Sequence, residues 1–363
     1  MPAAAASRIK PWVDELVELG GNPLILTSSS IPQGVSSTIR SFFPTPSNND
    51  FLPVRLFKEI LLGFDLGIKL FCRRYEYDSC IITSPPFFMA CICAFFAKLA
   101  KLPFIFDVRD RYPRVLTDLG YLKSTRLVYR ILASLEGWIY WRAEVITTVT
   151  HGLVSELKSN YPRLNFRLVR NGFDELVFTD EFLNFDKRNS FTVVYHGRLG
   201  RFYDLELYLE IMSIVHHADS TIRFLMIGEL PKKIQLHKPP NLEILPAMGL
   251  ESLAKILSSC HLGICLLRDL PAMKNAFPAK AYDFIGAGIP VLAGPQGELT
   301  NMVEELNLGI TFPVVTAQIV ADAILDIKDK KDYWYSKCAH VQKSRKHFGR
   351  RKIASDFFRQ KLF

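Results

Sequence analysis

Residues 276–294 read AFPAKAYDFIGAGIPVLAG and form the most informative segment of the chain. Pro278 is tolerated in the first turn of a helix, because the N–H that proline lacks would have no partner there. Gly286 and Gly288 then end the helix, and Pro290 opens a buried apolar strand. The stretch therefore predicts a helix followed by a parallel strand, which is the repeating unit of an α/β protein.

The helix expected in this stretch also carries a candidate anion site. A helix N-terminus presents free N–H groups and a partial positive charge, and both suit a diphosphate. Lys280 adds a cation in the first turn, and Asp283 offers a carboxylate that accepts hydrogen bonds from a ribose diol. An ordinary helix–glycine–strand unit explains the same residues without any ligand, so both interpretations stay open here.

Similar units extend over the whole chain. Short aliphatic runs alternate with longer helical patterns, and nearly every run is continuously apolar, which is typical of strands buried on both faces of a parallel sheet. The strands expected in the first half are Pro23–Ser28, Ser79–Ser84, Pro103–Asp107, Glu144–Val149 and Phe166–Val169. Those expected in the second half are Phe191–Tyr195, Ile222–Ile227, Leu242–Leu245, Leu262–Leu267, Val291–Ala293 and Ile310–Phe312. The sequence predicts two doubly wound domains, in which ligands bind beyond the carboxyl ends of the strands.

The 363 residues divide where the strand–helix pattern pauses. Residues 171–190 are polar, acidic and aromatic, with a turn-forming Asn-Gly pair, and a strong strand follows. We therefore expect an N-terminal domain over 1–185, a C-terminal domain over 186–335, and a basic helix over 336–363 that crosses back to the first domain. The first helix precedes the first strand, although a doubly wound domain begins with a strand. The opening strand is thus expected to be missing from this chain or to lie upstream.

The net charge of +9 is concentrated at the C-terminal end. Residues 331–363 hold ten lysines and arginines and two acids. Such a segment attracts nucleic acid or anionic lipid, although a solvated helix face has the same composition.

Cysteine usage and apolar runs indicate an intracellular protein. The seven cysteines are odd in number and form no CxxC motif, so reduced thiols in a cytosolic protein are expected rather than disulfides or a zinc site. No secretory signal is expected at the N-terminus. The run Phe87–Ala97 is too short to span a bilayer, and it is predicted to be a buried helix.

Two further segments place charge at strand ends. The stretch 193–204, VVYHGRLGRFYD, leaves a buried strand for a loop in which Gly197 and Gly200 allow close backbone approach to a ligand. Arg198 and Arg201 in this loop could neutralise phosphates. The spacing is not GxGxxG, and a plain strand–turn–helix remains an alternative.

The second of these segments is 104–113, FIFDVRDRYP. Asp107, Arg109, Asp110 and Arg111 cluster where a parallel strand should end, which favours a site over a structural role. Because buried charges are costly unless paired, Arg109 is expected to pair with one of the two aspartates. The chain contains no HExxH, DxD, GxSxG or Cys/His cluster, so neither a metal site nor a serine-hydrolase nucleophile is expected.

Together these segments resemble the family 4 (group 1) glycosyltransferases of the GT-B fold, especially bacterial members that build O-antigen, capsule or exopolysaccharide. The resemblance covers most of the chain. It is carried, in the order of the family, by ITSPPFFMA, PFIFDVRDRYP, LEGWIYWRAEVITTVT, VRNGFDELVF, VVYHGRLG, FPAKAYDFIGAGIPVLAG and GELTNMVEELNLGITF. PAAAASRIKPWVDEL also looks like the loop and first helix after the opening strand of the family.

The resemblance implies two Rossmann-like domains facing a cleft, and a retaining hexosyl or related transfer without a metal or other cofactor. The donor would be a UDP- or GDP-sugar. The donor-binding residues implied are Gly197, Arg198, Arg201 and Lys280 at the diphosphate and Asp283 at the ribose. The catalytic residues implied are Arg109, Asp110, Arg198 and Lys280.

The acceptor expected is a lipid-linked or other glycan in cell-surface polysaccharide synthesis. The basic C-terminal segment, the Phe-rich run and residues 127–142, which mix aromatic and basic side chains, could hold the protein on anionic lipid. We therefore expect a cytoplasmic protein that is peripheral at the inner face of the plasma membrane.

Three departures from the family pattern keep an alternative open, and the first is the expected absence of the opening strand and its loop, which in the family helps to line the acceptor side. Asn275 and Asp283 stand where the family usually has two glutamates, and Arg201 replaces the usual lysine after the GR loop. A catalytically impaired GT-B scaffold that binds a nucleotide sugar or a partner enzyme has the same features. A GT-B epimerase is disfavoured by the basic C-terminal segment, a nicotinamide dehydrogenase by the absent glycine fingerprint, and a nucleic-acid binder rests on the charge of that segment alone.

Overall fold

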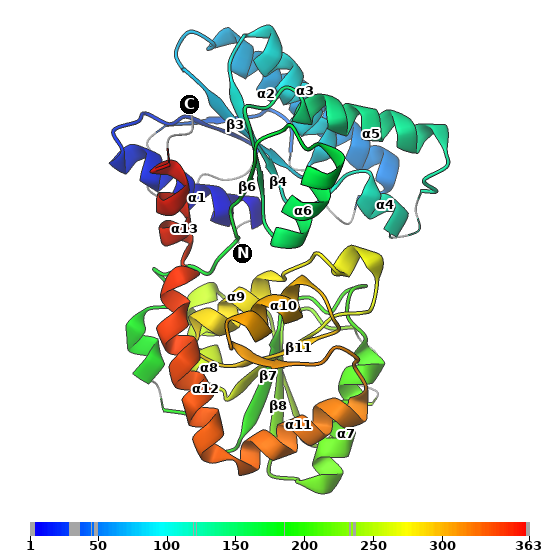
Figure 1. Cartoon of the computed structure of the whole chain (residues 1–363), viewed down its shortest axis with the longest axis vertical. Coiled ribbons are helices and arrows are strands. Elements are labelled where there is room, and N and C mark those ends of the chain that lie inside the picture. Colours follow the sequence, from blue (N-terminus) through cyan, green and yellow to red (C-terminus); the bar gives the residue numbers. More distant parts are fainter. Residues whose placement is uncertain are drawn as a thin grey trace. The chain divides into compact units, whose positions relative to one another are not determined.

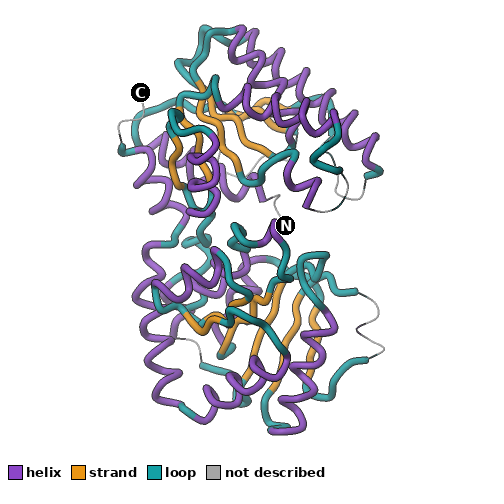
Figure 2. Tube along the Cα trace, turned by 45° about the vertical axis from the view of Figure 1, so that its right-hand side comes forward, coloured by secondary structure: helices purple, strands orange, loops and turns teal. Residues whose placement is uncertain are grey.

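The computed structural model describes residues 4–28, 37–44, 46, 50–118, 120, 122–184, 186–231, 234 and 237–360 (Figures 1 and 2). It divides into two compact units. The N-terminal unit comprises Pro2–Val169 and Ala354–Phe363, and the C-terminal unit comprises Arg170–Ile353. Both units are built from parallel sheets and helices, which confirms the α/β fold class expected from the continuous apolar runs.

The N-terminal unit contains two parallel sheets. The larger has the order β3-β4-β5-β6, and the smaller pairs β1 with β2. The strands are β1 Ile25–Thr27, β2 Thr38–Arg40, β3 Cys80–Ser84, β4 Phe104–Val108, β5 Val145–Thr148 and β6 Phe166–Leu168. Every residue of β4 and β5 is buried, including the polar Asp107, Thr147 and Thr148, as expected of strands that are covered on both faces.

The helices of the N-terminal unit are α1 Ala4–Glu18, α2 Leu52–Cys72, α3 Phe87–Leu99, α4 Arg114–Asp118, α5 Leu127–Tyr140 and α6 His151–Asn160. The run expected to be a buried helix forms α3, and Phe87, Ala90, Cys93, Ala94 and Ala97 on this helix are buried. Among the residues with a described position, none of the helices combines the length and apolarity that a membrane crossing requires.

The C-terminal unit is organised around one six-stranded parallel sheet in the order β12-β11-β10-β7-β8-β9. The strands are β7 Thr192–His196, β8 Arg223–Ile227, β9 Leu242–Leu245, β10 Leu262–Leu266, β11 Val291–Gly294 and β12 Gly309–Thr311. The chain moves outward from β7 to β9 and then returns to place β10 on the other side of β7. The strand order therefore reverses between β7 and β10, and such a switch point is where open α/β sheets bind ligands.

Helices cover both faces of this sheet (Figure 1). The α-helices of this unit are α7 Leu205–Ala218, α8 Leu250–Ser259, α9 Ala279–Gly286, α10 Glu298–Glu305, α11 Ala317–Asp329 and α12 Lys331–Ser344. The last helix, α13 Arg350–Phe358, begins in this unit and ends in the N-terminal one. Short 3₁₀ helices are η1 Asp180–Asn184, η3 Pro271–Met273 and η4 Arg345–His347. One apolar core packs under α8, α9 and α10, and a second under α7, α11 and α12. This two-faced covering is the doubly wound arrangement that the sequence predicts.

The unit boundary lies earlier than the sequence pattern suggests. The predicted boundary follows residue 185, whereas the structure assigns Arg170 onward to the C-terminal unit. The reason is that Phe173, Phe178 and Phe182 are buried in the core of that unit.

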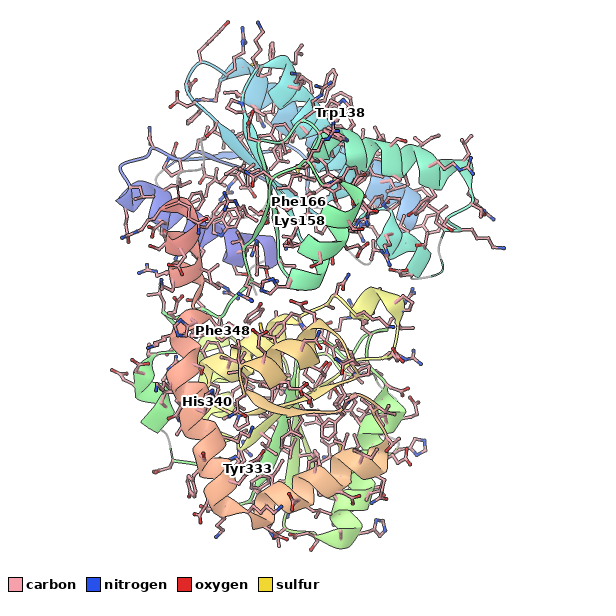
Figure 3. All side chains as sticks on the ribbon, viewed as in Figure 1. Trp138, Lys158, Phe166, Tyr333, His340 and Phe348 are labelled. Atoms are coloured by element: carbon pink, nitrogen blue, oxygen red, sulfur yellow. The ribbon has the colours of Figure 1, made fainter. Side chains whose placement is uncertain are left out.

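The C-terminal segment contributes to both units in turn. Helix α12 packs on the C-terminal unit through Trp334, Cys338 and Val341, and Tyr333, His340 and Phe348 mark the course of this segment in Figure 3. Residues from Ala354 onward belong to the N-terminal unit, where the ring centroids of Phe357 and Trp12 are 5.5 Å apart.

The eleven strands expected from the sequence are all present, with ends that differ by no more than two residues. Strand β2 was not predicted, because its three residues, TIR, form no apolar run and are only partly buried.

Candidate functional site

The loop after β7 lies at the switch point of the C-terminal sheet. Its first residue, Gly197, has φ +92° and donates its N–H to the carbonyl of Ile227 at 2.8 Å. Gly228, at the end of β8, has φ +130°, and a Cβ there would lie 2.6 Å from the carbonyl oxygen of Gly197. The two loops thus pass in direct contact, and glycine is required at both positions.

Lys280, in the first turn of α9, lies at this switch point as a buried lysine. Its side chain is only 8% exposed, and its Nζ lies 3.7 Å from the ring centroids of both Tyr195 and Tyr203. Within the described part of the chain, no group accepts a hydrogen bond from this ammonium. Burial lowers the pKa of Lys280 to about 7. A buried cation without an anion is costly, and this arrangement fits a site that receives an anionic ligand.

The two tyrosines form an aromatic wall around Lys280. Tyr195 is the fourth residue of β7, and its hydroxyl donates to the carbonyl of Arg198 at 3.0 Å. Its ring meets that of Tyr203 edge to face, with centroids 5.5 Å apart. Sequence reasoning quoted both residues in VVYHGRLGRFYD but assigned them no role. The available signal was two aromatic side chains flanking a Gly-rich loop after a buried strand.

Asp283 lies one turn after Lys280 and faces His196, the last residue of β7. The carboxylate Oδ2 is 3.5 Å from His196 Nε2, and both side chains are buried. Burial, with a contribution from Lys280, lowers the pKa of His196 to about 3, so this imidazole is neutral at pH 7. Burial raises the pKa of Asp283 to about 7. The pair is therefore not an ion pair at neutral pH, and Asp283 exchanges its proton within the physiological range. His196 was not singled out from the sequence.

The residues expected to bind the nucleotide-sugar donor differ in their exposure to solvent. Gly197 borders Lys280, whose Cε would be the nearest atom to a Cβ on that glycine, at 3.9 Å. Arg198 is 64% exposed, with its Nε 3.9 Å from a carboxylate oxygen of Glu229, and Arg201 is also exposed. The structure thus brings Gly197, Lys280 and Asp283 close together inside the unit. It leaves Arg198 and Arg201 on the exposed part of the loop.

In the N-terminal unit, the charged cluster after β4 is organised around Asp107. This carboxylate is fully buried and accepts two hydrogen bonds from Arg8, at 2.8 and 3.0 Å. Thr147 and Thr83 donate to the same carboxylate at 2.7 and 3.2 Å. Burial by itself would raise the pKa of Asp107, but the guanidinium of Arg8 and these hydrogen bonds hold it below its usual value.

The expectation that Arg109 pairs with an aspartate is wrong. Arg109 Nη2 donates to the carbonyl of Pro85 at 3.1 Å, and no ion pair of Arg109 occurs between residues of described placement. Asp107 is already held by Arg8, which approaches from α1 and was not singled out from the sequence. Asp110 lies at the exposed end of the cluster.

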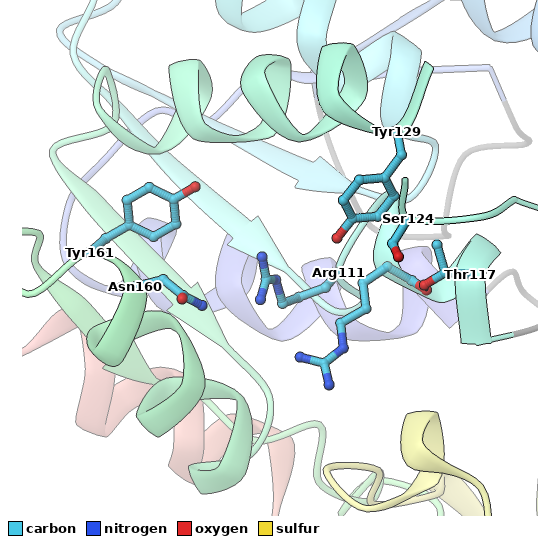
Figure 4. A pocket seen from close by; sticks show the side chains of 7 residues that line it. Arg111, Thr117, Ser124, Tyr129, Asn160 and Tyr161 are labelled. Carbon is cyan, nitrogen blue, oxygen red and sulfur yellow. The ribbon is translucent and has the colours of Figure 1, made fainter. Parts of the chain in front are cut away.

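A polar pocket of about 590 Å³ lies beside this cluster, within the N-terminal unit (Figure 4). It is lined by Arg111, Arg114, Thr117, Ser124, Tyr129, Asn160 and Tyr161. Arg111 is ion-paired with Glu156 at 2.6 Å and with Glu136 at 3.1 Å. The guanidinium charge is thus already balanced, and the pocket presents hydroxyl, amide and aromatic groups rather than a free positive charge.

Over the described ranges, no three His, Cys, Asp or Glu side chains are placed to hold a metal ion.

Comparison with known proteins shows what this chain is similar to. Residues 190–329 match the family model described as "Glycosyl transferases group 1". The chain is also similar to "Probable glycosyltransferase WbjE" of Pseudomonas aeruginosa. The two are 23% identical over 314 residues, which cover 82% of this chain and 78% of that protein.

Solved structures share the fold over almost the whole chain. A structure of HepE from Anabaena in complex with UDP has a TM-score of 0.70 at 14% identity, covering 98% of this chain and 94% of that one. WaaG, a glycosyltransferase involved in lipopolysaccharide biosynthesis, has a TM-score of 0.66 at 12% identity, covering 96% of this chain and 94% of its own. The chain therefore has the GT-B fold, and its residues 190–329 are similar to the group 1 glycosyltransferases.

Proposed function

We propose that this protein is a retaining, metal-independent glycosyltransferase that moves a hexosyl or related sugar from a UDP- or GDP-sugar to a lipid-linked glycan. The observation that carries the proposal is the buried, unpaired ammonium of Lys280 at the switch point of the C-terminal sheet. A diphosphate at this point supplies the anion that the protein itself does not provide.

The donor diphosphate is assigned to the N-terminus of α9 and the loop after β7. Helix α9 begins at Ala279 without a side-chain cap, so its first N–H groups and its dipole favour a negative charge nearby. Lys280 neutralises the diphosphate from inside the unit, and Arg198 and Arg201 approach it from the exposed side of the loop. The UDP bound in the HepE structure supports a uridine nucleotide as the first donor to test.

The same groups act in the chemical step. Cleavage of the sugar–phosphate bond leaves the bonding electrons on the phosphate, so negative charge grows on the departing diphosphate. Lys280 and the N-terminus of α9 stabilise that charge in a buried setting where water screens it poorly. One such contact contributes about 3 kcal/mol to the transition state, or roughly 100-fold in rate.

Asp283 is assigned to the ribose of the nucleotide. Its carboxylate can accept two hydroxyl hydrogen bonds from a diol, and the neutral His196 lies beside it, with Nε2 3.5 Å from Oδ2 and no hydrogen bond between them. Because hydroxyl donors favour the ionised carboxyl, ribose binding lowers the pKa of Asp283 from about 7.

The acceptor is assigned to the N-terminal unit. Asp110 is exposed at the carboxyl end of β4, and Arg109 beside it keeps a buried Nε that finds no acceptor among the residues with described positions. The neighbouring polar pocket offers hydroxyl, amide and aromatic groups of the kind that hold a sugar. A role in cell-surface polysaccharide synthesis at the inner face of the plasma membrane is supported by WaaG, a relative in fold that is involved in lipopolysaccharide biosynthesis.

Ligand-induced stabilisation tests the donor assignment directly. Binding to the folded protein alone raises its apparent melting temperature. The melting temperature of the wild type is measured with UDP, GDP and their common sugar conjugates. We expect at least one of these nucleotides to raise the melting temperature of the wild type without raising that of Lys280→Met. Lys255→Met, at an exposed lysine of α8, is the matched control and should respond like the wild type. If no nucleotide stabilises the wild type, or if Lys280→Met responds normally, the donor site is wrongly assigned.

A second candidate function is a scaffold that binds a nucleotide sugar without transferring it. It is favoured by Asp283, which is shorter than glutamate and carries a raised pKa. Donor binding without release of nucleoside diphosphate, even with lipid-linked acceptors from bacterial membranes, would select this candidate. Release that requires the acceptor selects the transferase.

A further inference from the structure

Helix α2 carries apolar side chains on the face that points away from the protein. Val54, Phe57, Phe64 and Ile68 are between 46% and 61% exposed, and their spacing places them on one stripe of the helix. The opposite face packs so closely on α3 that a Cβ on Gly67 would lie 2.3 Å from the ring of Phe96. The exposed stripe is thus not a misplaced core face, because α2 already has a buried one.

The apolar surface continues over the two helices that pack next to α2. Helix α3 contacts both α2 and α5, and the three helices lie close together in Figure 1. Across the α2–α3 contact, the ring centroids of Phe64 and Phe96 are 6.3 Å apart, and those of Phe96 and Phe95 are 5.8 Å apart. We call the exposed residues of the three helices the outer apolar face: Val54, Phe57, Phe64, Ile68, Phe95, Leu99, Leu127, Val128, Ile131 and Leu135.

The C-terminal unit has no comparable surface over its described residues. Its large exposed apolar side chains are scattered: Leu176, Val314, Ile319, Tyr333 and Tyr335. Isolated exposed apolar residues are normal on soluble proteins, whereas a contiguous set marks an interaction surface. The asymmetry therefore points to a function of the N-terminal unit.

The charge around the outer apolar face identifies its partner. Residues 51–74, 87–101 and 122–142 contain eleven lysines and arginines and three acids. Two of the acids, Glu59 and Glu136, are buried, and the third, Asp65, is paired with Lys69 at 2.8 Å. Four of the cations are paired with acids: Arg55, Lys58, Lys69 and Arg73. The cations that are exposed and have no ion pair among the described residues are Lys98, Lys101, Lys123, Arg126, Arg130 and Arg142, so the unpaired exposed charge around this face is positive. Apolar helices bordered by lysine and arginine complement the acyl chains and headgroups of an anionic lipid surface.

The basic C-terminal segment is a weaker candidate for lipid contact. Arg345 is buried and paired with Asp180 at 2.9 Å, and Arg359 is paired with Glu15 at 3.2 Å. Arg350 donates to the carbonyl of Gly172 at 3.2 Å. Part of the charge that the sequence places in this segment therefore holds the fold together.

We propose that the outer apolar face is the surface by which the protein inserts into an anionic membrane, with α2, α3 and α5 lying along the lipid interface. The proposal rests on the proposed function, because a lipid-linked acceptor requires the enzyme to work at such an interface. It adds the residues that make the contact and assigns it to the N-terminal unit.

Vesicle co-sedimentation of the full chain tests this contact. With vesicles of phosphatidylcholine and phosphatidylglycerol (7:3), we expect the fraction bound to exceed that on pure phosphatidylcholine at least tenfold. The double variant Phe57→Ser/Phe64→Ser should lower binding to the anionic vesicles at least tenfold. Leu176→Ser/Val314→Ser removes two exposed apolar side chains from the C-terminal unit and should bind within twofold of the wild type.

A native cysteine provides a second, local measurement. Cys72 is exposed and lies one turn after Ile68 on α2, so a fluorophore attached there reports on the outer apolar face. Burial raises the pKa of the other thiols to about 11 for Cys265 and about 12 for Cys80, Cys91, Cys93, Cys260 and Cys338, so labelling is selective for Cys72. An environment-sensitive label should shift to shorter wavelength on anionic vesicles and stay unchanged on neutral ones.

Two results would overturn the proposal: equal vesicle binding by the wild type and Phe57→Ser/Phe64→Ser, or no binding of the wild type to anionic vesicles. A protein partner for this face would produce the second result. Nucleotide stabilisation of Phe57→Ser/Phe64→Ser reports separately on the fold and the donor site. If Phe57→Ser/Phe64→Ser binds both nucleotide and vesicles like the wild type, only the membrane contact is contradicted. If the wild type binds no nucleotide, only the donor assignment is contradicted.

Discussion

The ammonium of Lys280 lies 3.7 Å from the centroid of the Tyr203 ring and takes no part in a hydrogen bond or ion pair among the described residues. A cation over an aromatic face gains some stabilisation from the ring quadrupole, on the order of 2 kcal/mol when water is excluded. That gain is smaller than the penalty of burying an ammonium, which is why the pKa of Lys280 is lowered to about 7. An anion that binds beside Lys280 therefore stabilises the charged form of this side chain.

Nucleotide binding should take up a proton at pH 8. Lys280 is mostly neutral at this pH because its pKa in the empty site is about 7, and a bound diphosphate raises that pKa by favouring the charged form. Calorimetric titration with UDP in phosphate and in Tris, whose ionisation enthalpies differ, measures the number of protons exchanged. We expect an uptake approaching one proton. Lys280→Arg, which stays charged throughout, should remove this uptake, and an equal uptake in that variant would show that another group titrates.

Replacing Lys280 should stabilise the empty protein. The pKa of lysine in an unfolded chain is about 10.4, so between pH 7 and 10 the unfolded state binds more protons than the folded one. Stability of the wild type therefore rises with pH over this interval. Lys280→Met lacks this dependence, and we expect it to be more stable at pH 7 by roughly 1–3 kcal/mol, with the advantage disappearing above pH 10.5. Thermal melts from pH 6 to 10.5 test this, and a lower Tm for Lys280→Met at pH 7 would contradict the buried-cation interpretation.

The ring of Tyr203, rather than its hydroxyl, should matter for donor binding. Tyr203→Phe keeps an aromatic face beside Lys280, whereas Tyr203→Leu removes it and lets the ammonium leave its position at the switch point. We expect Tyr203→Leu to weaken UDP binding by about 3- to 30-fold, in line with a cation–π contribution of 1–2 kcal/mol. Tyr203→Phe should bind within about threefold of the wild type. Similar losses in both variants would instead assign the effect to the hydroxyl group.

The N-terminal unit should depend on the ion pair between Arg8 and Asp107. Removing one partner leaves a buried charge without compensation, which costs about 3–5 kcal/mol. We expect Arg8→Met to lower the stability of the N-terminal unit by this amount, measured by urea unfolding. The exposed Arg163 provides the control, and Arg163→Met should change stability by less than about 0.5 kcal/mol. Comparable stability of both variants would mean that the carboxylate finds another partner.

Much of the C-terminal unit was predictable from the sequence. Strands such as β7 and β10 are buried on both faces, so most of their residues are apolar and the sequence shows them as short apolar runs. The Gly-bounded helix after β10 placed Lys280 at a helix N-terminus, because Pro278 and Gly286 mark its two ends locally. Helix ends of this kind are marked by residues that are adjacent in the sequence, so they can be predicted without knowing the tertiary contacts.

The parts that escaped prediction depend on residues far apart in the chain. Arg8 and Asp107 are separated by 99 positions, and no local pattern shows that α1 delivers a guanidinium to the end of β4. The rings of Tyr195 and Tyr203 meet only because the loop between them folds back over Lys280. In the same way, the boundary at Arg170 follows from the packing of Phe173 and Phe178, which is invisible in the composition of that segment.

The central claim is that Lys280 is the buried cation that receives the donor diphosphate. The most direct measurement is the calorimetric affinity for the stabilising nucleotide in the wild type, Lys280→Met and Lys255→Met. We expect Lys280→Met to lose at least about 100-fold in affinity, the equivalent of roughly 3 kcal/mol, while Lys255→Met stays within about twofold of the wild type. An affinity of Lys280→Met equal to that of the wild type would contradict the account.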